Sequence, residues 1–236
     1  MNSAQPLRSQ TLLIDADDTL WENNIYFERA IADFISFLNH QEYSPAQVRK
    51  VLNQVERESI VSHGYGLRSF THSLVRTFEH LSVEPLTPAL HETIHGFART
   101  IAEQPVRLLP KVEETLKYLA DRHRLILVTK GDFREQSGKV KRSGLQKHFS
   151  AIEIVLEKDV RQYRHIVNGH ALAVEHTWMV GNSPRSDINP ALAAGINAIF
   201  VPHDDTWILE HEELAPPEPP SRLLVLNSFA ELANHF

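Results

Sequence analysis

The sequence contains no cysteine, and this absence excludes several kinds of chemistry. Without thiols the chain forms no disulfide bond, no zinc site with thiolate ligands and no cysteine nucleophile. Long apolar runs are also missing, since none approaches the roughly 18 residues that a membrane-spanning helix requires. The opening residues, MNSAQPLRSQ, lack the apolar segment of a secretory signal. We therefore expect a soluble, cytoplasmic protein.

An excess of positive charge is absent as well. The formal net charge is −6, which argues against a general affinity for nucleic acid or for anionic membranes. Apolar residues make up 42% of the 236 positions and charged residues 23%, the usual mixture of a globular protein with its own hydrophobic core. This length fits one large domain, or one domain that carries a sizeable insert. The sequence leaves the oligomeric state open.

Residues 22–104 show the spacing of amphipathic helices. Apolar residues recur three and four positions apart in four successive segments. The second segment has a strong start signal, because Ser44 and Gln47 form the pattern of a capping box around Pro45. Amphipathic helices joined by short loops are typical of a small bundle. We therefore assign 22–104 to an all-helical domain.

The rest of the chain alternates between short apolar runs and amphipathic helices. The apolar runs lie at 10–14, 124–129, 151–156, 177–180, 197–201 and 222–226. Helices are predicted near 112–119, 133–143, 159–170, 187–194 and 228–236. Apolar strands that alternate with helices are typical of a parallel sheet covered on both faces. The predicted fold is therefore α/β, a Rossmann-like doubly wound parallel sheet formed by 1–21 and 105–236, with the all-helical domain inserted between them.

The first predicted strand ends in a dense group of carboxylates. Residues 12–21 are LLIDADDTLW, so Asp15, Asp17 and Asp18 follow directly on a buried run. At a separation of ~4 Å and an effective dielectric constant near 20, each like-charged pair costs up to about 4 kcal/mol. A bound cation, a reaction, or both would explain why the chain places this charge there.

Polar residues also follow three later strands, namely Thr129, Lys158 and the run GNSPRSD at 181–187. In open α/β sheets, ligands bind beyond the carboxyl ends of the strands. Together with DADDT at 15–19, these residues resemble the four motifs of the haloacid dehalogenase superfamily, in the right order. The helical insert directly after the first motif is similar to the C1 cap of that superfamily. The resemblance therefore spans nearly the whole chain.

The resemblance assigns a role to each motif residue. It implies that Asp15 is a nucleophile that forms an aspartyl-phosphate. Asp17 would protonate the leaving oxygen and then deprotonate the attacking water. Thr129 would donate its hydroxyl to the phosphoryl oxygens, and Lys158 would neutralise both Asp15 and the transferring group.

The resemblance also implies a Mg²⁺ ion. Its ligands would be Asp15, the backbone carbonyl of Asp17, Asn182 and Asp187, and the ion would offset the repulsion between Asp15 and a phosphate dianion. Asn182 departs from the family pattern, because relatives usually carry an Asp there. An amide oxygen ligates Mg²⁺ without adding a charge, so we expect either weaker metal binding or a larger share of it at Asp187.

Other positions depart from the pattern or lie outside the motifs. Asp18 stands where many relatives have Gly, and we interpret it as a turn or cap residue, while Asp159 stands where Pro is frequent. In the cap, Arg68 belongs to the glycine-containing stretch 62–70 and is predicted to hold a second anionic group of the substrate, with a simple polar turn as the alternative. Lys139 fits a solvated helix face, with contact to a substrate tail as the alternative.

The resemblance thus predicts a Mg²⁺-dependent phosphatase acting on a small phosphorylated metabolite. A phosphomutase would use the same motifs and return the phosphoryl group to a sugar. A haloacid dehalogenase uses the same nucleophile without a metal, but usually lacks the second Asp, so Asp17 argues against it. A non-catalytic phosphate-binding protein is supported only by Asn182. Because specificity lies in the cap, the sequence does not name the substrate.

Overall fold

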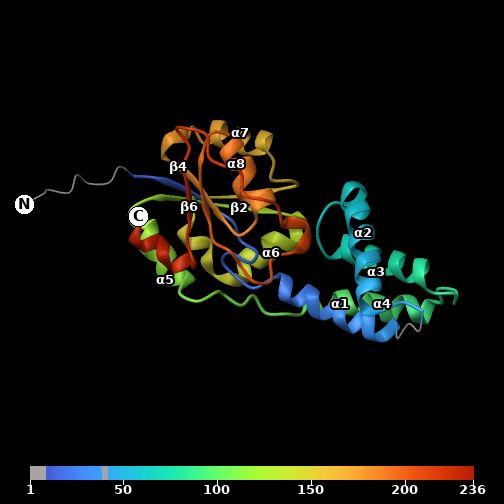
Figure 1. Ribbon diagram of the computed structural model, residues 1–236. Coiled ribbons are helices and arrows are strands. Elements are labelled where there is room, and N and C mark those ends of the chain that lie inside the picture. The colour runs from blue at the N-terminus through green and yellow to red at the C-terminus, as the bar shows by residue number, and fades with distance from the viewer. Residues whose placement is uncertain (1–8, 39–41) are drawn as a thin grey trace, which may run out of the picture. The chain divides into compact units, whose positions relative to one another are not determined.

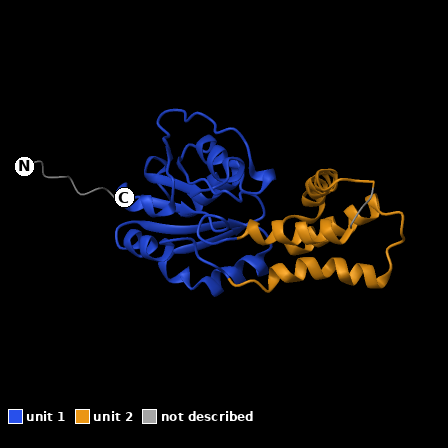
Figure 2. Cartoon of the chain, turned by 60° about the horizontal axis from the view of Figure 1, so that its bottom comes forward, with its two compact units in different colours: residues 1–22, 106–236 blue, residues 23–105 orange. Residues whose placement is uncertain are grey.

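The computed structural model describes residues 9–38 and 42–236 (Figure 1). The chain divides into two compact units (Figure 2): unit 1 comprises residues 1–22 and 106–236, and unit 2 comprises residues 23–105. In the described ranges, no helix is long and apolar enough to cross a membrane.

Unit 1 is built on a parallel sheet with the strand order β3-β2-β1-β4-β5-β6. The strands are β1 Thr11–Ile14, β2 Arg124–Lys130, β3 Ala151–Val155, β4 Thr177–Gly181, β5 Asn197–Phe200 and β6 Leu223–Val225. The chain passes outward from β1 through β2 and β3, then returns to the other side of β1 as β4 and continues to β6. This reversal places the switch point of the sheet at β1 and β4, where ligands bind in such folds. The predicted doubly wound parallel sheet is confirmed.

Helices cover both faces of this sheet, because successive strand residues point to opposite sides. Leu12 and Ile14 pack with α5 (Val112–Ala120), α6 (Phe133–Ser143) and the C-terminal segment. Leu13 packs on the opposite face with α7 (Val160–Gly169) and α8 (Asn189–Ala193). The three side chains have no exposed surface. Burying each one fully contributes about 1.5–3 kcal/mol, so the end of β1 is a rigid place for a functional residue.

Unit 2 contains the helices α1 Asn24–Leu38, α2 Pro45–His63, α3 Leu67–Leu81 and α4 Pro88–Ala102. Its core has fully buried side chains on each of these helices: Phe34, Leu52, Leu74 and Ile94. The predicted capping box at the start of α2 is present, with the Ser44 backbone N–H donating to Gln47 Oε1 at 2.8 Å and Gln47 N–H donating to Ser44 Oγ at 3.4 Å.

Two predicted helices differ from the structure. The C-terminal segment forms a 3₁₀ helix over Phe229–Asn234 in place of an α-helix. Its residues Phe229 and Leu232 lie three positions apart and are both buried in the core of unit 1, a spacing that the tighter 3₁₀ turn places on one face. The helix expected near 187–194 begins earlier, as one π-helical turn over Pro184–Ile188, and continues as α8.

Candidate active site

Asp15 lies at the carboxyl end of the central strand. Its backbone N–H continues the sheet by donating to the Val180 carbonyl at 2.9 Å, and its side chain is buried. The chain then turns sharply, and Leu20 N–H donates to the Ala16 carbonyl at 2.8 Å. Asp18 adopts φ 59° in this turn, a left-handed conformation that Asp tolerates better than most residues. Asp18 is therefore a turn residue, as expected.

Lys158 contacts two carboxylates in the interior of unit 1. Its ammonium donates to Asp15 Oδ1 and, at 2.7 Å, to Asp187 Oδ1. The Lys158 side chain is 3% exposed and that of Asp187 is 1% exposed, so this group is shielded from water. The following residue, Asp159, caps α7 by accepting a hydrogen bond from Gln162 N–H at 2.7 Å. This cap explains why the chain carries Asp rather than Pro at that position.

The loop after β4 places Asp187 beside Lys158. Asp187 Oδ2 accepts a hydrogen bond from Ser183 N–H at 3.0 Å and passes very close to Gly181. A Cβ atom at Gly181 would lie 2.2 Å from that oxygen, so only glycine fits there. The side chain of Asn182 is also buried, and its Oδ1 accepts a hydrogen bond from the Thr19 hydroxyl at 3.3 Å. The same hydroxyl lies 2.9 Å from Asp15 Oδ2, so its single hydrogen is shared between the Asn182 and Asp15 oxygens, which both lie beside it.

Two carboxylates and one ammonium leave this group with an excess of negative charge. Burial and the charge of Asp187 raise the pKa of Asp15 to about 7, against the opposing effect of Lys158. Burial would lower the pKa of Lys158, but Asp15 and Asp187 raise it well above its usual value. Lys158 is therefore always charged, whereas Asp15 needs a further cation nearby to be fully ionised at neutral pH.

Asp17 lies in a separate hydrogen-bond network. Lys139 Nζ donates to its two carboxylate oxygens at 2.9 and 2.8 Å, Gln136 Nε2 donates at 3.0 Å, and the Trp21 indole N–H donates at 2.6 Å. Burial would raise the pKa of Asp17, but the charge and hydrogen bonds of Lys139 and the other donors lower it. The expectation that Lys139 belongs to a solvated helix face is therefore wrong: this ammonium faces the proposed acid–base residue.

Thr129 is the second-last residue of β2, and its side chain is buried. Its hydroxyl donates to Gln136 Oε1 at 3.2 Å, and Gln136 in turn donates to Asp17. The structure thus brings Thr129 into one network with Asp17, and Lys158 into another with Asp15 and Asp187.

The family model described as haloacid dehalogenase-like hydrolase matches residues 10–195, well over half of the chain. The chain belongs to this family of hydrolases. A second model, described as HAD-hydrolase-like, matches residues 160–232.

Individual relatives agree with the family assignment. A phosphoserine phosphatase from Thermus thermophilus is 32% identical over 116 residues, which cover 44% of this chain and 47% of that protein. The chain thus spans about half the length of the curated relative that it matches. A solved haloacid dehalogenase-like family hydrolase from Xanthomonas campestris is 30% identical, with a TM-score of 0.83 over 97% of this chain and 94% of that chain.

More distant structures share the fold alone. The HAD-hydrolase YfnB from Bacillus subtilis, solved with magnesium, is 17% identical, with a TM-score of 0.68 over 97% of this chain and 98% of that chain. An L-2-haloacid dehalogenase from Xanthobacter autotrophicus is 14% identical, with a TM-score of 0.62 over 96% of this chain and 97% of that chain. The same architecture therefore serves more than one reaction.

Proteins of this family generally use a divalent metal, and the residues present here fit one. Asp15, Asn182 and Asp187 offer buried oxygens, and the single ammonium of Lys158 faces the two carboxylates of Asp15 and Asp187. A different trio of potential ligands in unit 1, Asp18, Glu22 and His203, has ligand atoms within 4.8 Å of one another. It is the one such His, Asp and Glu group within residues 9–38 and 42–236, and it shares only Asp18, the turn residue, with the first motif.

A third network supports the loop after β4, and the sequence analysis missed it. Lys130 Nζ donates to Glu210 Oε1 and to the Ser186 hydroxyl, each at 2.7 Å, while Ser183 Oγ donates to Glu210 Oε2 at 2.6 Å. Burial would raise the pKa of Glu210, but Lys130 and the serine hydroxyls lower it to about 2. This ion pair fixes the segment between Asn182 and Asp187. Lys130 follows Thr129 directly, but nothing in the surrounding sequence indicates its partner Glu210.

Arg68 lies in unit 2, where it is exposed in the first turn of α3. The glycines flanking the preceding turn have positive φ, 72° at Gly64 and 111° at Gly66. The proposed role of Arg68 in holding substrate stays a prediction.

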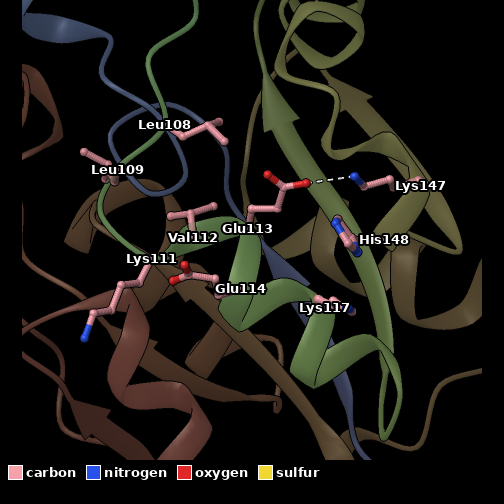
Figure 3. A pocket seen from close by; sticks show the side chains of 9 residues that line it. All are labelled: Leu108, Leu109, Lys111, Val112, Glu113, Glu114, Lys117, Lys147 and His148. Atoms are coloured by element: carbon pink, nitrogen blue, oxygen red, sulfur yellow. Dashed lines mark hydrogen bonds and ion pairs between the residues drawn. The ribbon is translucent and has the colours of Figure 1, made fainter.

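Unit 1 also carries a groove of about 630 Å³ that contains none of the motif residues (Figure 3). It runs past the start of α5, where Glu113 pairs with Lys147 at 2.8 Å. Its lining residues are Leu108, Leu109, Lys111, Val112, Glu113, Glu114, Lys117, Lys147 and His148. Because glutamates and lysines both line the groove, it has no uniformly positive surface that would bind an anion.

Proposed function

We propose that this hydrolase is a Mg²⁺-dependent phosphatase, which hydrolyses a small phosphomonoester through an aspartyl-phosphate on Asp15. The observation that carries the proposal is the buried group in which one ammonium, that of Lys158, contacts both Asp15 and Asp187. Asp17 stands two residues further along the chain and supplies a second carboxyl group. A nucleophilic carboxylate, a cation for the phosphoryl oxygens and a separate acid are the groups that such a reaction needs.

In the first step, a carboxylate oxygen of Asp15 attacks phosphorus, the bond from phosphorus to the leaving oxygen breaks, and Asp17 gives that oxygen a proton. In the second step, water attacks the aspartyl-phosphate, Asp17 takes a proton from the water, and the bond from phosphorus to Asp15 breaks. The Thr129 hydroxyl and the Lys158 ammonium hold the phosphoryl oxygens in both steps. General acid–base help of this kind is typically worth about 10²- to 10⁴-fold in rate.

We propose Asp15, Asn182, Asp187 and the backbone carbonyl of Asp17 as the residues that hold Mg²⁺. When bound, the ion neutralises the charge shared by the carboxylates and the phosphate. The support is that the Asp15 and Asn182 oxygens both lie beside the Thr19 hydroxyl, and that one ammonium, that of Lys158, faces the two carboxylates of Asp15 and Asp187. Asn182 contributes no charge, so we expect weaker metal binding than an Asp at that position would give.

The substrate class rests on the phosphoserine phosphatase relative and on the proposed site. That relative acts on a small phosphorylated metabolite, and we propose a substrate of the same general class. A haloacid dehalogenase is the second candidate, because one such enzyme shares the fold. Asp17 disfavours it, since cleavage of a carbon–halogen bond needs no second carboxylic acid. A phosphomutase would require a sugar bisphosphate to remain bound between its two half-reactions.

Assaying the purified protein against a panel of phosphomonoesters and 2-chloropropionate, with Mg²⁺ and with chelator, tests the proposal. We expect release of inorganic phosphate that requires Mg²⁺, and no release of chloride. Chloride release without metal would identify a dehalogenase, and conversion of one sugar phosphate into its isomer would identify a mutase. Either result would overturn the proposal.

A further inference from the structure

Helix α4 carries a sequence pattern that the proposed phosphatase does not use. Residues 91–95 are His-Glu-Thr-Ile-His. On a helix, this spacing places two imidazoles on one face, which is how two histidines bind zinc in several enzymes. The helix belongs to unit 2, and none of its residues takes part in the networks around Asp15 or Asp17.

The two imidazoles already lie together. The ring centroids of His91 and His95 are 4.2 Å apart, with the ring planes inclined by 36°. His91 is exposed and His95 is half-buried, so ions in solution can reach the pair. Within the described part of the chain, neither ring takes part in a hydrogen bond or an ion pair. Their nitrogens are therefore available as ligands.

Glu92 adds a carboxylate beside the pair. It forms an exposed ion pair with Arg99, and Arg99 is the main reason why the pKa of Glu92 is lowered, with smaller effects from His95 and His91. Glu92 and His95 lie three positions apart on α4, so their side chains share a helix face. Exposed ion pairs of this kind are weak, so a dication can compete with Arg99 for Glu92. Across residues 9–38 and 42–236, no carboxylate or further imidazole has a ligand atom within 4.8 Å of those of both His91 and His95. Glu92 therefore has to break its ion pair with Arg99 to reach a metal ion bound by the two histidines.

We propose that His91 and His95 form a binding site for a divalent transition-metal ion, with Glu92 as a third ligand. Zn²⁺ is the best match, because imidazole nitrogen and carboxylate oxygen are its usual ligands besides thiolate, and water can fill the remaining position. Mg²⁺ is a poor match, because it prefers an all-oxygen set. The site is independent of the proposed phosphatase reaction and is expected to bind its ion whether or not that reaction occurs.

Calorimetric titration of the untagged full-length protein with Zn²⁺, in buffer that contains a large excess of Mg²⁺, tests the site. The excess Mg²⁺ occupies the proposed catalytic site, so the titration reports other sites. We expect His91→Gln and His95→Gln each to weaken Zn²⁺ binding by about tenfold or more, since even the loss of a supporting group around a metal costs that much. Glu92→Gln should also weaken binding. Arg99→Gln should strengthen it, because it releases Glu92 and removes a competing cation.

Two controls make the result specific. His63 and His72, on α2 and α3, form another close imidazole pair of unit 2, with centroids 4.4 Å apart. The double variant His63→Gln/His72→Gln should bind Zn²⁺ as the wild type does, and so should His203→Gln, which removes the imidazole of the Asp18 group. Circular dichroism establishes that each variant is folded, and His91→Ala and His95→Ala replace any glutamine variant that is not. Unchanged Zn²⁺ affinity in both the His91 and His95 variants, or loss of binding in either control, would overturn the proposal.

Discussion

Lys139 Nζ donates hydrogen bonds to both carboxylate oxygens of Asp17, at 2.9 and 2.8 Å. The two residues come from different elements, since Lys139 lies on α6 and Asp17 in the turn after β1. Lys139 keeps the pKa of Asp17 low and therefore keeps the proposed acid–base residue ionised. In the proposed reaction, Asp17 has to be protonated before it can donate a proton to the leaving oxygen, so the ion pair with Lys139 disfavours this first step. The ion pair favours the second step, in which ionised Asp17 takes a proton from water.

The first prediction concerns this ion pair. Lys139→Met removes the positive charge and should raise the pKa of Asp17, so the limb of the pH–kcat/KM profile that Asp17 controls should move to higher pH. Lys141→Met is the matched control, because Lys141 is exposed on the same helix. Profiles for both variants and the wild type provide the measurement. A profile that does not move in Lys139→Met would mean that Asp17 is not the titrating acid.

The sequence predicted the elements around this site better than it predicted their contacts. Most strands and helices of unit 1 follow from local periodicity, and the parallel sheet follows from their alternation. The strand order comes from the structure. Gln136 and Lys139 lie three positions apart on α6 and therefore share a helix face. That spacing indicates that this face of α6 contacts a polar group. Which carboxylate it meets depends on how α6 packs beside the end of β1, and periodicity does not give this.

Long-range partners account for what the sequence could not show. Glu210 lies 80 residues after Lys130, in an irregular segment with no motif, yet their atoms meet at 2.7 Å. The C-terminal segment has the apolar spacing of an amphipathic helix, but it forms a 3₁₀ helix that buries Phe229 and Leu232 in the core. In both cases, tertiary packing decides the outcome and local preference does not.

The second prediction concerns pH and stability. Glu210 has its pKa lowered from 4.5 to about 2, and its side chain is 11% exposed. A group whose pKa is lower in the folded than in the unfolded protein stabilises the fold at pH values above its unfolded pKa. This stabilisation is lost as the pH falls. Glu210 should therefore contribute about 3 kcal/mol to the free energy of unfolding at pH 7, and this contribution should disappear between roughly pH 5 and pH 2. Glu210→Gln should therefore lower the free energy of unfolding at pH 7 and flatten its decline with acid.

Denaturant titrations at several pH values test this expectation. Glu113→Gln is the control, because Glu113 also pairs with a lysine but lies exposed on the surface. It should leave the unfolding midpoint nearly unchanged. A destabilisation of equal size in both variants would show that the buried Lys130–Glu210 pair stabilises the fold no more than an exposed ion pair does.

The third prediction concerns the proposed metal residues. Asn182→Asp adds a charge beside Asp15 and should lower the Mg²⁺ concentration that gives half-maximal activity. Asp187→Asn removes a charge and should raise it. It should also slow turnover, because Lys158 loses one of its two carboxylate partners. Activity titrations with Mg²⁺ in the wild type and both variants measure these shifts. Identical midpoints in all three proteins would exclude the loop after β4 from metal binding.

The fourth prediction concerns Arg68 in unit 2. If this guanidinium holds a second anionic group of the substrate, Arg68→Ala should raise KM by about tenfold or more, because a hydrogen bond to a charged group is worth about 1.5–3 kcal/mol. Hydrolysis of p-nitrophenyl phosphate should change little, since that compound has no second anion. Arg57→Ala, on the exposed face of α2, is the control. An equal loss on both substrates would instead indicate that Arg68 supports the turn at 62–70.

The central claim is that Asp15 carries the phosphoryl group during turnover. The most direct measurement is rapid acid quenching of the Asp17→Asn variant during reaction with p-nitrophenyl phosphate and Mg²⁺, followed by mass spectrometry of the peptide that contains Asp15. This variant slows hydrolysis of the intermediate, and p-nitrophenolate leaves without needing a proton, so the phosphoenzyme should accumulate. We predict a hydroxylamine-sensitive phosphoryl group on Asp15, absent when Asp15 is also changed to Asn. Phosphate release without any label on Asp15, or undiminished turnover in Asp15→Asn, would contradict the account.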